Sequence, residues 1–461
     1  MKPLHLKKII EVVEGELVFG TDDIYVEDAI IYHLHRLKQK NSLLFLDRRK
    51  EFQFEDVKSY EPVVIITDAR SMKEEYKNAL AVVEVKNIRT AVLTFARFYR
   101  GLFQIPIIAI TGTNGKTTTK DMVAHILTQY YSVQGTIRSR NAPKKSFQYL
   151  MGIDDDTDVG VFETGLGAPG NLRYHCDIFQ PTIGIITNIG VFHLDKCKTL
   201  ENYIQAKGEI IDGLNNKGTL LLNSDDENIA TLSLENYRGK VLYFGKKKTA
   251  NLRASNIVIH DDGTQFTLTN NQKKYQVHLP CLGEHQVYNA MAAIGAAVEA
   301  GVQIRYAIKA LETFNVLERH LQILKGIKDS TVIDDSWSLT PDALKAALKV
   351  LQSISNGRRK IALVGDIGRL GEHTEKYHRE VGDMIAEQNI DVLLTFGHAA
   401  LNMAKQVREQ NKNIRVFSYV DVEEVYIKVR ALLDSESILL FKCSNTDSEL
   451  VKIKNRLIDS Q

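Results

Sequence analysis

One stretch of the chain restricts its fold more than any other: Thr111-Gly-Thr-Asn-Gly-Lys-Thr-Thr118. The run 105–110 before it is apolar and β-branched, which predicts a short buried strand. The residues 117–130 after it have helical spacing. A strand, a glycine-rich turn and a helix in this order form a loop whose backbone N–H groups can surround phosphate oxygens. The sequence therefore predicts an α/β unit that binds a nucleotide.

Two side chains of this loop have expected tasks in such a site. Lys116 places a positive charge on the β- and γ-phosphates, and Thr117 offers its hydroxyl to Mg²⁺. The loop departs from the general pattern GxxxxGK[ST], because Ile110 occupies the first glycine position and Gly112 makes the turn instead. A glycine-rich turn that contains Lys and Thr by chance is the competing interpretation. The strand before the loop and the helix after it favour nucleotide binding.

Strand and helix patterns alternate along most of the chain, which indicates βαβ units and a parallel sheet. Between residues 240 and 280 the pattern changes to antiparallel hairpins, with a turn at Asp261-Asp-Gly263. A second alternating series predicts a Rossmann-like unit, in which Thr340-Pro341 supplies a helix N-cap and a first-turn proline. We therefore predict an α/β fold with three domains: a small N-terminal α/β domain (1–103), a central P-loop ATPase-like parallel sheet with an antiparallel subsheet (104–315) and a C-terminal Rossmann-like domain (316–461).

Composition excludes several other classes of protein. Of the 461 residues, 44% are hydrophobic and 25% are charged, as in ordinary globular chains and unlike disordered or collagen-like ones. The net charge of +2 gives no reason to expect a nucleic-acid partner, and no apolar run is long enough to span a membrane. Four widely spaced cysteines without a CxxC pair argue against a zinc site or a disulfide framework. We expect a cytoplasmic protein whose partners are small molecules.

Three polar residues follow later elements of the same series. Glu163 comes directly after a predicted strand, His193 follows the next strand, and Lys207 lies in the helical segment beyond it. The carboxyl ends of parallel strands meet at one edge, where such sheets bind ligands. Glu163 would complete a Mg²⁺ site with Thr117, and His193 would belong to a second one. Taken singly, each could equally be structural, with Lys207 a surface lysine paired with Glu209; their order after the loop favours a site.

This order of motifs resembles the Mur ligase family, the ADP-forming amide-bond ligases of cell-wall precursor synthesis, from about residue 107 to 450. The loop 112–118 is similar to the family's GTNGKTT, and Glu163 resembles its magnesium-binding glutamate. Asn188 and His193 match the family's Asn-x-x-x-x-His element. Lys207 resembles the lysine that this family carbamylates, whose carbamate would bind a second Mg²⁺.

The resemblance also implies which residues surround the nucleotide. Gly283-Glu-His285 with Asn289 resembles the segment that contacts the adenine. Arg319 and Asp335 resemble the hinge arginine and the third-domain aspartate that reach the nucleotide when the domains close. The implied nucleotide-binding residues are Gly112, Thr113, Asn114, Gly115, Lys116, Thr117, Thr118, Asn188, His285, Asn289, Arg319 and Asp335. The implied catalytic residues are Lys116, Glu163, His193 and Lys207, the implied metal ligands are Thr117, Glu163, His193 and Lys207, and the implied cofactors are ATP and one or two Mg²⁺ ions.

Within the family, the stretch Val364-Gly-Asp-Ile-Gly-Arg-Leu-Gly-Glu-His373 is most similar to members that add D-alanyl-D-alanine to UDP-N-acetylmuramoyl-tripeptide. This resemblance implies ATP-dependent ligation in peptidoglycan precursor synthesis. A carboxylate is activated as an acyl phosphate and is then attacked by an amine. The implied substrates are a carboxylate acceptor, such as a UDP-sugar peptide, bound by the N-terminal domain (1–103), and an amine or dipeptide bound by the C-terminal domain (316–461). We expect a monomer.

Departures from those members cluster at substrate-binding positions. Tyr32-His-Leu-His-Arg36 replaces an Asp-Ser-Arg turn, and the following segment 41–62 is shorter and lacks an Asp-Gly-His element. Three further replacements are Arg138-Ser-Arg-Asn141-Ala-Pro143 for Gly-Asn-x-Asn-Asn, Trp337-Ser-Leu-Thr-Pro341 for Tyr-Asn-Ala-Asn-Pro, and Lys442-Cys-Ser-Asn-Thr446 for Lys-Gly-Ser-Arg-Gly. Since each unpaired polar group in a binding site costs roughly 1–3 kcal/mol, such changes can alter the substrate.

Two alternative functions therefore stay open beside the D-alanyl-D-alanine ligase. One is a paralogue that joins an amino acid or amine to a non-muramyl carboxylate. The other is a pseudoenzyme that binds ATP as a switch, against which the retained Lys116, Glu163, His193 and Lys207 count.

Overall fold

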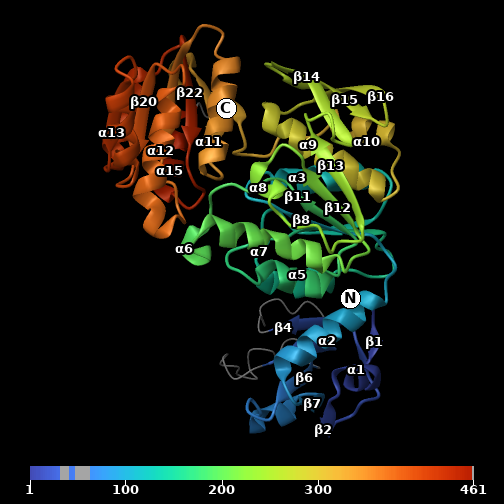
Figure 1. Ribbon diagram of the computed structural model, residues 1–461. Coiled ribbons are helices and arrows are strands. Elements are labelled where there is room, and N and C mark those ends of the chain that lie inside the picture. Colours follow the sequence, from blue (N-terminus) through green and yellow to red (C-terminus); the bar gives the residue numbers. More distant parts are fainter. Residues whose placement is uncertain (32–40, 47–62, 459–461) are drawn as a thin grey trace.

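The computed structural model describes residues 1–31, 41–46 and 63–458, and it is built around three main β-sheets (Figure 1). The sheet of the N-terminal residues lies at one end, a nine-stranded sheet lies in the middle, and a six-stranded sheet lies at the other end. Each sheet falls within one of the three predicted ranges. The predicted α/β fold is confirmed, whereas the boundaries 1–103, 104–315 and 316–461 remain a prediction.

The N-terminal sheet has five strands in the order β2-β7-β6-β5-β4, parallel except for β2. Its central strands are short apolar runs, and their buried side chains pack against α1 and α2. The elements are β1 (Leu4–His5), α1 (Leu6–Val13), β2 (Glu16–Gly20), β3 (Tyr25–Val26), β4 (Asp28–Ile31), β5 (Ser42–Phe45), β6 (Val63–Asp68), η3 (Glu74–Asn78), β7 (Ala81–Val85) and α2 (Ile88–Gly101).

A single hydrophobic core joins this unit to the central one. Phe45 of β5 and Phe95 of α2 pack on Phe147 of the central unit, with ring centroids 5.8 and 6.1 Å from it. Phe162 and Phe179 belong to the same core and stack on each other at 4.1 Å. Each buried aromatic side chain contributes about 1.5–3 kcal/mol of hydrophobic free energy. The first two units therefore share one packed interior.

The central sheet has the order β16-β15-β14-β13-β12-β11-β8-β10-β9, and its antiparallel part is confined to β14, β15 and β16. The chain runs from β8 to β10 on one side and then returns to β11 on the other, so the strand order reverses at β8. Ligands bind at such a reversal in open α/β sheets. The strands are β8 (Ile107–Thr111), β9 (Val133–Gly135), β10 (Val159–Glu163), β11 (Ile183–Ile186), β12 (Thr219–Asn223), β13 (Lys240–Gly245), β14 (Leu252–His260), β15 (Gly263–Asn270) and β16 (Lys273–Leu279).

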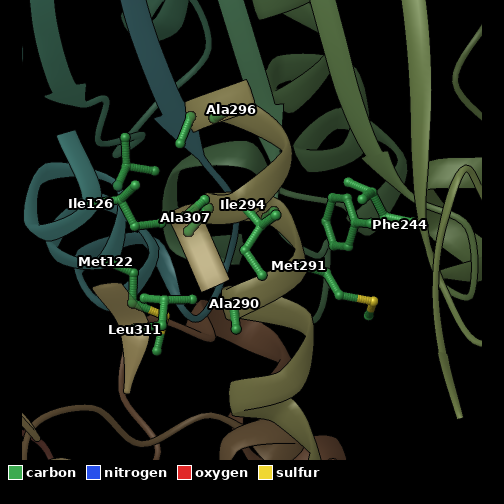
Figure 2. Close-up of a cluster of buried hydrophobic side chains, with 14 of the residues drawn as sticks. Met122, Ile126, Phe244, Ala290, Met291, Ile294, Ala296, Ala307 and Leu311 are labelled. Carbon is green, nitrogen blue, oxygen red and sulfur yellow. The ribbon is translucent and has the colours of Figure 1, made fainter. Parts of the chain in front are cut away.

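The helix that follows the glycine loop is anchored by a second, alanine-rich helix, α9. Figure 2 shows this core, in which Met122 and Ile126 of α3 lie near Ala290 and Ile294 of α9. Small side chains on α9 let the two helices approach closely, which fixes the start of α3 beneath the loop. The helices are α3 (Lys116–Leu127), η4 (Pro143–Lys145), α4 (Ser146–Leu150), α5 (Asn171–Phe179), α6 (Leu194–Cys197), α7 (Leu200–Gly213), α8 (Glu227–Ala230), α9 (Glu284–Glu299) and α10 (Ile304–Leu311).

The C-terminal sheet has the order β17-β18-β22-β19-β20-β21, parallel except for the edge strand β17. Thr340 caps α11 as predicted, because its hydroxyl accepts a hydrogen bond of 3.2 Å from the Ala343 amide. The elements are β17 (Gln322–Lys325), η5 (Ile327–Asp329), β18 (Thr331–Asp335), α11 (Pro341–Ser353), β19 (Arg359–Val364), η6 (Gly371–His373), α12 (Thr374–Ala386), β20 (Val392–Phe396), α13 (Ala400–Gln410), β21 (Arg415–Tyr419), α14 (Val422–Leu432), β22 (Ser437–Lys442) and α15 (Ser448–Leu457). Within the described ranges, none of the helices is both long and apolar enough to cross a membrane.

Polar contacts bring the C-terminal unit onto the central one. The ring Nε2 of His373 donates to the Lys198 carbonyl at 2.9 Å, and the Asp195 amide donates to the Arg369 carbonyl at 3.3 Å. The Thr340 hydroxyl donates to Asn114 Oδ1 of the glycine loop at 3.2 Å. The loop and the start of α11 therefore face each other across a cleft.

Candidate functional site

The cleft between the central and C-terminal units has a volume of about 1410 Å³. Its walls contain most of the predicted nucleotide and metal residues, namely Thr113, Asn114, Gly115, Lys116, Thr117, Thr118, Glu163, Asn188, His193, His285, Asn289 and Asp335. The predicted residues Gly112, Lys207 and Arg319 lie outside this lining. The fold thus brings together residues that are up to 222 positions apart in the chain.

The glycine loop has a backbone that only glycine adopts readily at two positions. Gly112 has φ 148° and Gly115 has φ 79°. A Cβ atom at Gly112 would collide with Thr187 Oγ1, and one at Gly115 would collide with Asn289 Oδ1. Both glycines are therefore required by conformation and by space. The loop ends at the N-terminus of α3, where free N–H groups and the helix dipole favour a phosphate.

Asn188 holds this loop in place from the neighbouring strand. Its side-chain Oδ1 accepts from the Asn114 amide at 2.9 Å, and its Nδ2 donates to the Asn114 carbonyl at 3.0 Å. Its own carbonyl accepts from the Thr113 amide at 2.9 Å. The predicted Asn188 thus borders the cleft and braces the loop through three hydrogen bonds.

Lys116 lies at the base of the cleft with its ammonium group turned back onto the loop. Its Nζ donates to the Thr113 carbonyl at 2.8 Å. Burial lowers the pKa of Lys116, while the negative charge of Glu163 opposes this shift. A phosphate group in the loop would raise the pKa of Lys116 again, because an anion favours the ammonium ion.

Glu163 has the surroundings expected of a magnesium ligand. Its Oε2 accepts from the Thr117 hydroxyl at 2.9 Å, and its Oε1 accepts from the side-chain amide of Asn141. Burial raises the pKa of Glu163, and Lys116 and these two hydrogen bonds act in the opposite direction. Mg²⁺ in phosphate sites is held by one or two carboxylates and by substrate oxygens rather than by a full protein cage. Thr117 and Glu163 together fit that pattern.

His193 faces the same cleft with one ring nitrogen unused. Its Nδ1 is buried and has no hydrogen-bond partner among the described residues. Burial, followed by the charges of Lys207 and Lys116, lowers its pKa to about 3, so the ring is neutral at physiological pH. A neutral imidazole with a free lone pair fits a metal ion. In residues 1–31, 41–46 and 63–458, no group of three or more His, Cys, Asp or Glu side chains is arranged as a metal cage.

Lys207 is buried behind the loop, with an exposed fraction of 1%. Its Nζ donates to Thr111 Oγ1 at 3.1 Å and to the Gly112 carbonyl at 2.9 Å. Burial, assisted by the charge of Lys116, lowers the pKa of Lys207 well below its ordinary value. A lowered pKa favours the neutral amine, which is the form that reacts with CO₂.

His285 and Asn289 occupy the first turns of α9 on the other side of the loop. Asn289 Oδ1 accepts from the Thr119 hydroxyl at 3.3 Å, and its Nδ2 donates to Gln286 Oε1 at 2.9 Å. Burial lowers the pKa of His285 to about 4, so its ring is neutral. A neutral ring and an amide at this wall fit an uncharged base better than a phosphate.

The C-terminal wall is organised around Trp337. Arg319, at φ 65°, donates from Nε to Ser336 Oγ at 2.9 Å, and its guanidinium lies 5.6 Å from the centre of the Trp337 ring. Asp335 accepts from Lys442 Nζ at 2.5 Å. Arg319 and Asp335 therefore bind partners within their own unit, and only Asp335 lines the cleft.

The sequence prediction missed the roles of three residues in this site. Asn141 was noted only as part of a departing segment, yet its amide binds Glu163. Thr340 was expected only to cap α11, yet it also reaches Asn114. Lys442 was named only as the start of a departing segment, yet it pairs with Asp335. The departure at 32–36, including His33 and His35, and most of the segment 41–62 lie outside the described residues.

Comparison with known proteins agrees with this geometry. The family model for the Mur ligase middle domain matches residues 110–297, and the model for the Mur ligase, glutamate ligase domain matches residues 319–445. The UDP-N-acetylmuramoyl-tripeptide–D-alanyl-D-alanine ligase of Bacillus subtilis (strain 168) is 27% identical over 457 residues, which cover 99% of this chain and 98% of that protein.

Solved structures have the same fold. A crystal structure of MurF from Acinetobacter baumannii superposes with a TM-score of 0.84 at 22% identity, covering 99% of both chains. The MurF ligase from Thermotoga maritima in complex with ADP superposes with a TM-score of 0.76 at 18% identity, covering 93% of this chain and 98% of that one. Since the two family models together span more than half of its length, the chain belongs to the Mur ligase family.

Proposed function

We propose that this protein is an ATP-dependent, ADP-forming ligase that joins UDP-N-acetylmuramoyl-tripeptide to D-alanyl-D-alanine. The observation that carries the proposal is the placement of Glu163 beside Thr117 of the phosphate loop, in a cleft closed by the C-terminal unit. The activity named for the similar ligase of Bacillus subtilis, which matches nearly the whole chain, supports the choice of substrates. We further propose that the enzyme acts as a monomer in the cytoplasm.

In the first step, a carboxylate oxygen of the acceptor attacks the γ-phosphorus of ATP. The bond between this phosphorus and the β,γ-bridging oxygen breaks, so that an acyl phosphate forms and ADP leaves. The loop amides and the N-terminus of α3 bind the phosphate oxygens. Lys116 leaves the Thr113 carbonyl and neutralises the charge that develops on the transferred group.

Mg²⁺, when bound, neutralises and orients the phosphate oxygens. Thr117 and Glu163 would hold one ion, and His193 with a carbamylated Lys207 would hold a second. In its neutral form the Lys207 amine would form a bond from nitrogen to the carbon of CO₂, and the nitrogen would release one proton to water, so that the side chain ends in a carbamate with a negative charge. A protein environment that depresses the lysine pKa favours this modification.

In the second step, the amine nitrogen attacks the acyl carbon, the carbon–oxygen bond to phosphate breaks, and the nitrogen loses a proton. The acyl phosphate would hydrolyse in open water. The C-terminal wall, which includes Trp337 and Asp342, therefore has to exclude water and align the amine.

A second candidate function follows from the departing segments. Trp337, Ser338, Asn445 and Thr446 all line the cleft. They lie where an amine or acceptor would meet the nucleotide, so their exchange favours a paralogue that uses the same ATP chemistry on a different carboxylate or amine.

The test is ADP release by the purified protein with MgATP, UDP-N-acetylmuramoyl-tripeptide and D-alanyl-D-alanine, each omitted in turn. Lys116→Ala serves as the inactive control. Release that requires all three substrates supports the proposal. Binding of MgATP without release under these conditions contradicts it, and a panel of other carboxylates and amines then separates the paralogue from an ATP-dependent switch.

A further inference from the structure

A buried serine and histidine lie next to the cleft but outside its lining. Ser146 is the first residue of α4, and His175 lies in the middle of α5. Both have an exposed fraction of 1%, so neither can meet a substrate. The proposed reaction assigns no task to either residue.

The hydrogen bonds of His175 fix its tautomer. Its Nε2 lies 3.1 Å from the Gly165 carbonyl, and its Nδ1 lies 2.7 Å from Ser146 Oγ. A carbonyl oxygen can only accept, so Nε2 carries the proton, and Nδ1 accepts from the Ser146 hydroxyl. Burial lowers the pKa of His175 to about 4, which keeps this neutral form across the physiological range. The His175 ring therefore links the start of α4, which follows the loop of Asn141, to the loop of Gly165 that follows β10.

Both of these loops lead to Glu163. Gly165 lies two residues after it, and the Gly165 amide donates to the Asn141 carbonyl at 3.2 Å. The side chain of Asn141 then donates to Glu163 Oε1. A Cβ atom at Gly165 would collide with Asn141 Oδ1, so the two loops are in close contact. A series of hydrogen bonds therefore leads from Ser146 through His175, Gly165 and Asn141 to the Glu163 carboxylate.

We propose that His175 is a positioning residue, which acts through Gly165 and Asn141 to hold the Glu163 carboxylate in the orientation that binds Mg²⁺. This inference rests on the proposed function only in taking Glu163 as a magnesium ligand. Groups that orient a ligand from behind typically change metal affinity about 10–100-fold when they are removed. The side-chain amide of Asn141 uses only one lone pair of Oε1. The other lone pair stays available, so the carboxylate can be held in place and still bind Mg²⁺.

The test measures ADP affinity by calorimetry at zero and at saturating Mg²⁺, and it needs neither acceptor nor amine. His175→Leu fills the space without hydrogen bonds, and Ser146→Ala removes only the donor to Nδ1. We expect each variant to raise the apparent dissociation constant for Mg²⁺ in the ternary complex, by about tenfold for His175→Leu. ADP affinity without Mg²⁺ should stay unchanged, because the glycine loop is not involved.

A matched control separates positioning from loss of packing. His378 is also fully buried, and its ring bonds to the Thr374 carbonyl at 2.7 Å and to the Ile367 amide at 3.1 Å. His378→Leu should lower the melting temperature as His175→Leu does, but leave the Mg²⁺ constant unchanged. Equal Mg²⁺ constants in both variants would overturn the inference.

Two further variants distinguish this inference from the metal assignment itself. Glu163→Gln should raise the dissociation constant for Mg²⁺ more than His175→Leu or Ser146→Ala does. If it does so while His175→Leu has no effect, the positioning role is wrong and the metal site stands. If Glu163→Gln leaves the constant unchanged, Glu163 is not the ligand and the inference fails with it.

Combining Ser146→Ala with Asn141→Ala should give less than the sum of their separate effects, because both act through the same contact.

Discussion

The hydroxyl of Thr340 makes two hydrogen bonds, and a substitution can remove both without changing the shape of the side chain. It accepts from the Ala343 amide, which caps α11, and it donates to Asn114 Oδ1 across the cleft. Valine has the same shape without the hydroxyl. We therefore predict that Thr340→Val lowers both the stability of the C-terminal unit and the rate of ligation.

The two effects have separate magnitudes. Loss of a threonine N-cap costs about 1 kcal/mol of unfolding free energy. The bond to Asn114 is 3.2 Å long, which is at the weak end for a hydroxyl donor, so its loss costs about 0.5–1 kcal/mol. Only the loss of the bond to Asn114 affects closure of the cleft. It should lower kcat/KM roughly two- to fivefold.

Urea unfolding measures the loss of stability, and ADP release measures the loss of kcat/KM. Thr340→Ser keeps the hydroxyl and should behave like the original protein in both assays. In an Asn114→Ala background, Thr340→Val should still lower stability but should cause no further loss of rate, because the bond across the cleft is already absent. A Thr340→Val variant with lower stability and an unchanged kcat/KM would refute the reasoning.

Three other predictions follow from the site. Gly115→Ala should weaken ADP binding by at least about tenfold in a calorimetric titration, because φ 79° is costly for alanine and its Cβ would strike Asn289. ADP release should fall in CO₂-depleted buffer and recover with bicarbonate if Lys207 is carbamylated, whereas an unchanged rate would exclude the modification. Acid should destabilise the fold: burial lowers the pKa of His175 and His285 from 6.5 to about 4, so each contributes stability that is complete above pH 6.5 and decreases as the pH falls towards 4. The free energy of unfolding measured by urea titration should therefore fall between pH 7 and pH 5, by an amount of order 2 kcal/mol for each ring, and His175→Leu should show a smaller fall.

The sequence predicted those parts of the fold whose signal is local. The bounds of the strand and helix around the glycine loop were predicted within three residues, and the N-cap was predicted at Thr340 itself. Strand β17 was missed because it is a short edge strand whose side chains alternate between half-buried and exposed. Strand β9 was missed for a related reason, since its three residues are only half-buried and carry little apolar pattern.

The residues of the site likewise divide into those that a local sequence pattern predicts and those that it does not. The glycine loop is contiguous and follows from backbone chemistry, whereas Glu163 and His193 required the argument that parallel strands end at one edge. The bond from Thr340 to Asn114 joins residues 226 positions apart, and no pattern in either segment indicates the other. The series of hydrogen bonds through His175 is likewise invisible in sequence, because a histidine in an amphipathic helix has the same pattern whether or not it orients a neighbouring loop.

The way the three units are joined explains how such a cleft can work. The N-terminal and central units share an aromatic core, so separating them would expose several buried rings. The C-terminal unit meets the central one through a few polar contacts, with Val191, Ile259 and Leu282 adding a limited apolar area. Each polar contact contributes about 1 kcal/mol, so the open and closed arrangements differ by only a few kcal/mol. A nucleotide that touches both walls can shift such a balance, whereas it could not separate the aromatic core. We therefore expect the cleft to open on the C-terminal side, whereas the N-terminal unit stays fixed relative to the phosphate loop.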